Sequence, residues 1–74
     1  MVSKSPKLLV RFGERVRELR QATGLSQEAF ADRCGLDRTY ISGIERGKRN
    51  VSLENLKVLA EALDVTLSGL LEGL

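Results

Sequence analysis

The stretch that decides the fold is residues 27–44, which read QEAFADRCGLDRTYISGI. They have the pattern of two helices of about eight residues, joined by a three-residue turn that contains Gly35. Ala31 lies four residues before that glycine, and Ile41 and Ile44 lie six and nine residues after it. A small side chain at Ala31 allows the second helix to cross the first closely, and the two isoleucines fix its inner face. The pattern therefore predicts a helix-turn-helix.

Helical spacing continues on both sides of this unit. Leucines and other apolar residues recur every three or four positions in residues 6–22, with a stop at Gly24, and again in residues 53–63. A short helix is expected over about residues 66–73. The fold class that follows is all-α: a compact five-helix, repressor-like domain over residues 6–74, preceded by a flexible arm at residues 1–5. Gly13 interrupts the first helix, and close packing is the only reason for it that the pattern offers.

The helix boundaries carry their own signals. Ser5, Ser26, Asp37 and Ser52 each stand just before a predicted helix, where a side-chain oxygen can accept a backbone N–H bond. Gly35 stops the helix that precedes it, in a left-handed conformation that glycine adopts without strain.

Composition excludes several classes of function. The 74 residues contain one cysteine and no histidine, which rules out a disulfide framework and leaves too few ligands for a His/Cys metal cluster. The chain has no Gly-rich phosphate loop, and its carboxylates are scattered, so we expect neither an enzyme nor a cofactor or metal. The longest apolar runs, such as residues 8–10, are far too short for a membrane span. We expect a soluble cytoplasmic protein, with Cys34 as a small core residue.

Charge is distributed unevenly along the chain. The net charge is +5 over residues 1–50 and −3 over residues 51–74. Such asymmetry is typical of a protein with one end facing an anion such as nucleic acid. A solvated charged surface explains the same numbers equally well. The charged residues of the first helix, Arg11, Glu14, Arg15 and Glu18 among them, are expected to form such a solvated face.

The residues from 25 to 63 resemble a known family. The segments LSQEAFA (25–31), YISGIERGKRN (40–50) and LAEAL (59–63) are similar to the phage-repressor/Cro-type (XRE) helix-turn-helix family. Residues 37–47 with 50–53 especially resemble the controller proteins of restriction-modification systems. The resemblance implies a homodimer that binds a palindromic operator in double-stranded DNA. It implies that the protein regulates transcription by excluding or recruiting RNA polymerase and that it needs no small-molecule ligand. It also implies a bacterial or phage protein that works at the nucleoid.

The resemblance also assigns roles to single residues. Arg38, Thr39 and Ser42 match the positions that face base edges in the major groove, and arginine can donate two parallel hydrogen bonds to guanine. The expected phosphate-binding residues are Gln27, Tyr40, Arg46, Lys48, Arg49 and Asn50. Of these, Tyr40 is expected to pack its ring beside the turn and to offer only its hydroxyl. Gly43 departs from the polar residue common in phage repressors, which leaves a shallow spot where DNA can come close.

Two further expectations concern structure and assembly. The family pairs Glu45 with an arginine of the first helix, here Arg20, in a buried ion pair. The last helix carries more apolar side chains than so short an element needs, and family members dimerise through this region. The dimer residues expected here are Val65, Leu67, Leu70, Leu71 and Leu74. The alternative is that these side chains only close the core of the monomer.

Other functions of the same fold remain open at this point. An antitoxin or a phage-type repressor has the same pattern. A protein-interaction module that has lost DNA specificity is the rival from a different class. A set of polar and basic residues on one side, Gln27, Arg38, Thr39, Arg46, Lys48 and Arg49, argues against that rival.

Overall fold

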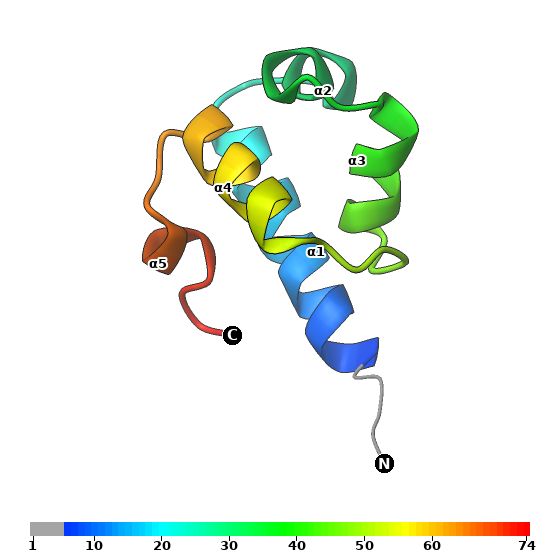
Figure 1. The fold of residues 1–74 in the computed structure, drawn as a ribbon, viewed down its shortest axis with the longest axis vertical. Coiled ribbons are helices and arrows are strands. Elements are labelled where there is room, and N and C mark those ends of the chain that lie inside the picture. The colour runs from blue at the N-terminus through cyan, green and yellow to red at the C-terminus, as the bar shows by residue number, and fades with distance from the viewer. Residues whose placement is uncertain (1–5) are drawn as a thin grey trace.

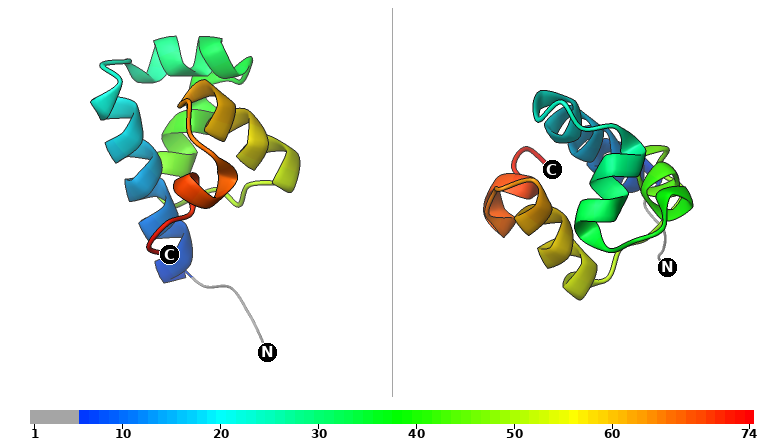
Figure 2. Two further views of the ribbon diagram at one scale, coloured as in Figure 1. Left: turned by 90° about the vertical axis from the view of Figure 1, so that its left-hand side faces the viewer. Right: turned by 90° about the horizontal axis from the view of Figure 1, so that it is seen from above.

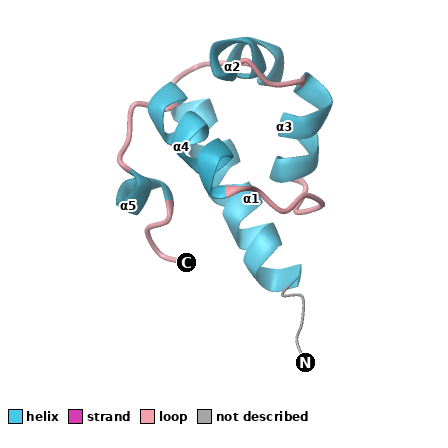
Figure 3. Ribbon diagram, viewed as in Figure 1, coloured by secondary structure: helices cyan, strands magenta, loops and turns pink. Residues whose placement is uncertain are grey.

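Residues 6–74 are described by the computed structural model, so the arm expected at residues 1–5 and the cap expected at Ser5 lie outside the described residues. Over residues 6–74 the chain forms five helices and no strand (Figure 3). Their bounds are α1 (Pro6–Ala22), α2 (Gln27–Cys34), α3 (Arg38–Glu45), α4 (Leu53–Ala62) and α5 (Leu67–Leu70). The predicted all-α fold class is confirmed.

The helices are arranged so that the helix-turn-helix and the C-terminal end lie on different sides. Helix α3 packs on α1 and α2, while α4 packs on α2 and α5. In Figure 1, α2 crosses the top of the molecule, α3 runs down the right-hand side, and α5 with the C-terminus lies on the left. After α5 the chain returns toward the N-terminal half of α1 (Figure 2). The helix-turn-helix and the C-terminal turn therefore lie on separate surfaces (Figure 1).

Side-chain caps begin four of the helices. Ser26, Asp37, Ser52 and Thr66 each accept a hydrogen bond from a backbone N–H two or three residues further along. The first three of these caps were predicted and are confirmed. Gly35 has φ = +70° at the end of α2, and its N–H returns to the carbonyl groups of that helix. The turn between α2 and α3 is thus set by a left-handed glycine followed by an aspartate cap.

A single apolar core holds α3 in place. Side chains from all five helices lie in it with less than 2% of their surface exposed: Val16, Phe30, Ile41, Ile44, Leu59 and Leu70. Ala31 of α2 is also buried in this core. Because Ile41 and Ile44 fix one side of α3, the opposite side faces solvent.

Gly13 has a specific structural reason. A Cβ atom at this position would lie 2.3 Å from the backbone oxygen of Ile44 and 2.7 Å from that of Glu45. Both distances are far below van der Waals contact, and both neighbours are backbone atoms. The absence of a side chain therefore allows α1 and α3 to pack backbone against backbone, in agreement with the close packing inferred from sequence.

The C-terminal end differs from expectation in two respects. Helix α5 ends at Leu70 instead of continuing to about residue 73, and the chain then turns through Gly73, which has φ = +84°. Leu70 is fully buried in the monomer, so its assignment to a dimer surface was wrong. Leu71 and Leu74 remain 38% and 37% exposed, whereas Val65 and Leu67 are half-buried against the core.

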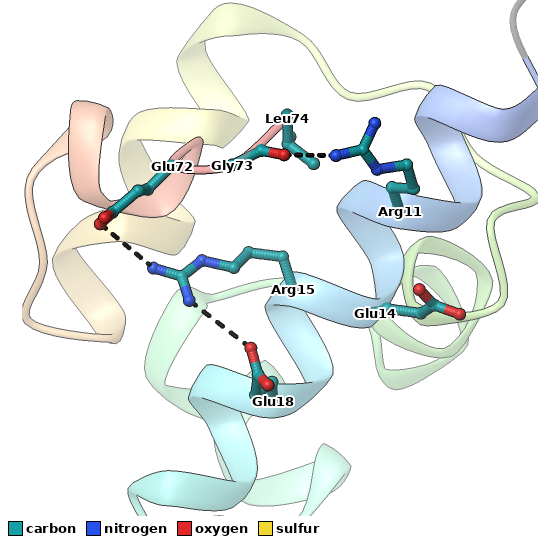
Figure 4. Close-up of a pocket in the computed structure, with 7 residues that line it drawn as sticks. All are labelled: Arg11, Glu14, Arg15, Glu18, Glu72, Gly73 and Leu74. Carbon is teal, nitrogen blue, oxygen red and sulfur yellow. Dashed lines mark hydrogen bonds and ion pairs between the residues drawn. The ribbon is translucent and has the colours of Figure 1, made fainter.

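Two arginines of α1 hold this C-terminal turn. Arg11 is exposed, as expected of a solvated face, whereas Arg15 is half-buried, and for it that expectation was wrong. Arg15 donates to the backbone oxygen of Gly69 at 2.8 Å and pairs with Glu72 at 3.9 Å. Arg11 donates to the oxygen of Gly73. Figure 4 shows both guanidinium groups reaching from α1 to the end of the chain, around a polar pocket of about 230 Å³. The position of the exposed leucines is thereby fixed relative to α1.

Cys34 is half-buried, and burial raises the pKa of its thiol to about 11, so it carries little thiolate at neutral pH.

None of the helices within residues 6–74 has both the length and the apolar character that a membrane span requires.

Candidate nucleic-acid interface

The first turn of α3 presents the expected base-reading residues. Arg38 and Thr39 are exposed, and Ser42 is half-exposed one turn further along. The Thr39 hydroxyl donates to Asp37 at 2.7 Å, and this bond, with a second from the Thr39 backbone N–H, lowers the pKa of the aspartate. Since its proton is engaged, Thr39 can offer a base only its methyl group and its oxygen lone pairs. Arg38 alone in this turn keeps several free donors.

The second half of α3 and the following loop carry the remaining cations. The Nε of Arg46 lies 3.4 Å from the backbone oxygen of Ser42, so this side chain folds back along its own helix. Lys48, Arg49 and Asn50 are all exposed. The Asn50 side-chain oxygen accepts from the N–H of Val51 at 3.1 Å, which leaves its amide N–H groups free to donate. Donors of this kind are suited to phosphate oxygens.

Arg20 of α1 and Glu45 at the end of α3 form a buried ion pair. Arg20 donates from Nε to one carboxylate oxygen of Glu45 at 2.6 Å and from Nη2 to the other at 3.0 Å. The two side chains are only 10% and 3% exposed. The hydrogen bond to Glu45 raises the pKa of Arg20, and a third donor of Arg20 binds the backbone oxygen of Leu25. The pair joins α1, the end of α3 and the loop before α2.

Gln27 is attached to the same carboxylate. Its Nε2 donates to Glu45 at 3.0 Å. A carboxylate can only accept, so this contact fixes which end of the Gln27 amide points inward. One N–H of the amide remains for another partner, and the side chain is half-exposed at the first turn of α2. The structure thus brings Arg20, Glu45 and Gln27 together. The contact between Gln27 and Glu45 was not predicted from the sequence.

Tyr40 and Gly43 occupy the flank of α3. The Tyr40 hydroxyl accepts a hydrogen bond from the Asn55 amide of α4 at 3.1 Å, and the Arg49 guanidinium lies 5.4 Å from the centre of the ring. Gly43 is buried because Arg49 covers it. The shallow spot expected at Gly43 is therefore filled by protein in the free chain. Asn55 was missed, since nothing in its spacing marks it as the partner of a residue fifteen positions earlier.

The model of the helix-turn-helix family matches residues 16–70 of the chain. The chain belongs to the helix-turn-helix family. Among its relatives, the control protein C.MunI of a Mycoplasma species is 55% identical over 62 residues, which cover 82% of this chain and 84% of that protein.

Solved structures of helix-turn-helix proteins agree with the fold. The restriction-modification controller protein C.AhdI of Aeromonas hydrophila superposes with a TM-score of 0.82 at 60% identity, over 84% of this chain and 94% of that one. The controller protein C.Esp1396I has been solved as a tetramer with its natural 35 base-pair operator. It superposes with a TM-score of 0.75 at 39% identity, over 80% of this chain and 78% of that one.

A second surface of this helix-turn-helix protein is apolar. An open groove of about 140 Å³ runs between the start of α1 and the C-terminal turn. Its lining residues are Leu8, Leu9, Phe12, Asn50, Val51, Leu56, Leu71 and Leu74. Leu8 is 48% exposed at its edge. Exposed apolar side chains concentrated in one place are characteristic of a protein interface.

Proposed function

We propose that the protein is a sequence-specific transcription regulator, a controller protein of a restriction-modification system that binds a palindromic DNA operator as a homodimer. The observation that carries the proposal is the exposed first turn of α3, with Arg38 free to donate, on a helix fixed by a buried core. The similarity to C.MunI and C.AhdI supports the controller assignment over an antitoxin or a phage repressor. The protein works through DNA binding and not through catalysis, at the bacterial nucleoid.

In this proposal Arg38, Thr39 and Ser42 face base edges, and the surrounding donors bind phosphates. Gln27 binds through the amide N–H that Glu45 leaves free. The other phosphate contacts come from Tyr40, Arg46, Lys48, Arg49 and Asn50. Phosphate contacts fix the position of the protein on the duplex, and base contacts select the sequence. Occupied operators then exclude RNA polymerase or recruit it.

Dimerisation supplies the second recognition helix that a palindromic operator requires. A two-fold dimer places two α3 helices about 34 Å apart, one turn of the duplex, and so requires a palindromic site. The proposed dimer element is the C-terminal turn with the apolar groove beside it. Leu71 and Leu74 provide its exposed side chains, whereas Val65 and Leu67 are half-buried against the core of the monomer. Leu8 of α1 continues the same surface.

Replacing Arg38 tests the base-reading role. Arg38→Ala is expected to reduce discrimination at one symmetric pair of positions in the operator by about 1–3 kcal/mol, because a bidentate contact to guanine is lost. Affinities for an operator duplex and for its single base-pair variants, at one salt concentration, measure this. Arg17→Ala removes the same charge from an exposed position of α1 and is the matched control. An equal loss on every duplex would assign Arg38 to a phosphate instead.

Replacing Leu71 tests the dimer surface. Leu71→Glu is expected to weaken dimerisation at least tenfold, because it introduces a charge into an apolar contact that excludes water. Sedimentation equilibrium over a range of concentrations gives the dimer dissociation constant. Gln21→Glu adds the same charge at an exposed position of α1 and should leave that constant unchanged. An unchanged dimer in Leu71→Glu would move the interface elsewhere.

A further inference from the structure

The loop residue Arg49 lies against α3 instead of extending away from it. A Cβ atom placed on Gly43 would lie 2.8 Å from the Cγ of Arg49 and 3.5 Å from its Nε. The guanidinium carbon is 5.4 Å from the centre of the Tyr40 ring, within the range at which a cation is attracted to an aromatic face. The side chain therefore crosses α3 at Gly43 and ends over Tyr40.

The Tyr40 ring is itself held from the other side. Its hydroxyl accepts from the Asn55 amide of α4, and the half-buried ring packs against the core. The backbone at Gly43 is also constrained, because its oxygen accepts the N–H of Lys48 at 2.9 Å at the start of the loop. The Gly43 notch, meaning the surface formed by Gly43 and the Tyr40 ring, is thus a rigid support for a long and otherwise flexible side chain.

The Gly43 notch lies beside the reading face of α3. Gly43 follows Thr39 by four residues, so the two are neighbours on the helix surface. An arginine held there meets DNA together with the first turn of α3. An arginine with the freedom of an exposed loop loses many rotamers when it binds, and one that is already held loses fewer.

We propose that Gly43 is a positioning residue, which by lacking a side chain holds Arg49 over Tyr40 as a DNA contact that is fixed before DNA arrives. This inference rests on the proposed function, since it gives the held arginine a part in operator binding. It also changes the role of Gly43. The glycine admits a side chain of the same protein, whereas the sequence suggested that it admits DNA.

Affinities for an operator duplex test the proposal through a double-mutant cycle. Gly43→Ala is expected to weaken binding about tenfold, because the new methyl group displaces Arg49 from Tyr40. Arg49→Ala should weaken binding at least as much. The double variant should bind like Arg49→Ala, within about twofold, since no arginine is left to displace. Arg17→Ala controls for the loss of one positive charge.

Tyr40 gives a second readout that needs no DNA. It is the only tyrosine, and the chain contains no tryptophan, so its ring proton shifts and its fluorescence belong to one residue. Gly43→Ala and Arg49→Ala should change these signals in the same direction. The melting temperature of Gly43→Ala should be unchanged or a few degrees higher, because alanine favours a helix over glycine and the contacted atoms belong to a flexible side chain.

The outcomes separate this proposal from the proposed function. One outcome overturns this inference alone: the wild type binds its operator specifically, and Gly43→Ala lowers the affinity even when Arg49 is already alanine. That result would mean that DNA itself comes close to Gly43. An unchanged Tyr40 signal in Gly43→Ala, or a fall in its melting temperature, overturns it as well. A wild-type protein without sequence preference overturns both proposals.

Discussion

Glu45→Ala is expected to lower the free energy of unfolding by about 3–5 kcal/mol, because it leaves the Arg20 guanidinium buried without its carboxylate. The variant also removes the acceptor of Gln27, so α1, α2 and α3 lose their common polar contact. A domain of this length has a total stability of about 4–11 kcal/mol. The expected loss is therefore a large fraction of the total stability. Urea titration followed by circular dichroism measures the change.

An exposed ion pair in the same chain provides the control. Lys57 and Glu61 lie one helical turn apart on α4, with side chains 61% and 67% exposed and a separation of 3.7 Å. Glu61→Ala should change the free energy of unfolding by no more than about 0.5 kcal/mol, since solvent screens exposed pairs. If Glu45→Ala unfolds at the same urea concentration as Glu61→Ala, the buried pair has no structural role.

Gly13→Ala is expected to destabilise the fold by about 3 kcal/mol, at the upper end of the cost of overpacking. The added Cβ would lie 2.3 Å from the Ile44 oxygen and 2.7 Å from the Glu45 oxygen, so α1 and α3 would have to move apart. Their separation would disturb the Phe12 and Ile44 packing and strain the Arg20–Glu45 pair. The gain in helix propensity of about 1 kcal/mol is smaller than these losses.

The matched control is Gly43, another glycine within a helix that has a close neighbour. At Gly43 the nearest atoms belong to the Arg49 side chain, which can rotate away, whereas at Gly13 they belong to backbone. Thermal unfolding should therefore distinguish the two variants, with a clear fall in melting temperature for Gly13→Ala and no fall for Gly43→Ala. A Gly13→Ala protein as stable as the wild type would mean that the two helices are not in backbone contact.

The sequence predicted the features that depend on residues close together in the chain. Apolar spacing and capping residues gave the helices, because a cap such as Ser26 and a left-handed residue such as Gly35 act on their own neighbours. Exposure at Arg38 followed from the inward positions of Ile41 and Ile44 on the same helix. Family resemblance, and not spacing, pointed to Arg20 with Glu45.

Contacts between segments that are far apart in the chain could not be predicted from the sequence. The distance between Gly13 and the Ile44 oxygen depends on how two helices cross, and nothing near Gly13 in sequence marks its partner. In the same way, Arg15 binds the Gly69 oxygen across 54 positions, and a backbone acceptor leaves no trace in side-chain identity. Leu70 was assigned to the surface because so short a helix offers no periodicity that would distinguish an inner residue from an outer one.

Selection of binding sites from a random duplex library measures whether the protein recognises a palindromic sequence. The wild-type protein should enrich a palindrome whose half-sites are centred about one helical turn apart, as a two-fold dimer with two outward α3 helices requires. The same selection with Arg38→Ala should lose the preference at one symmetric pair of positions. Failure to enrich any sequence, together with weak binding that falls steeply with salt, would contradict the account and leave a non-specific binder or an interaction module.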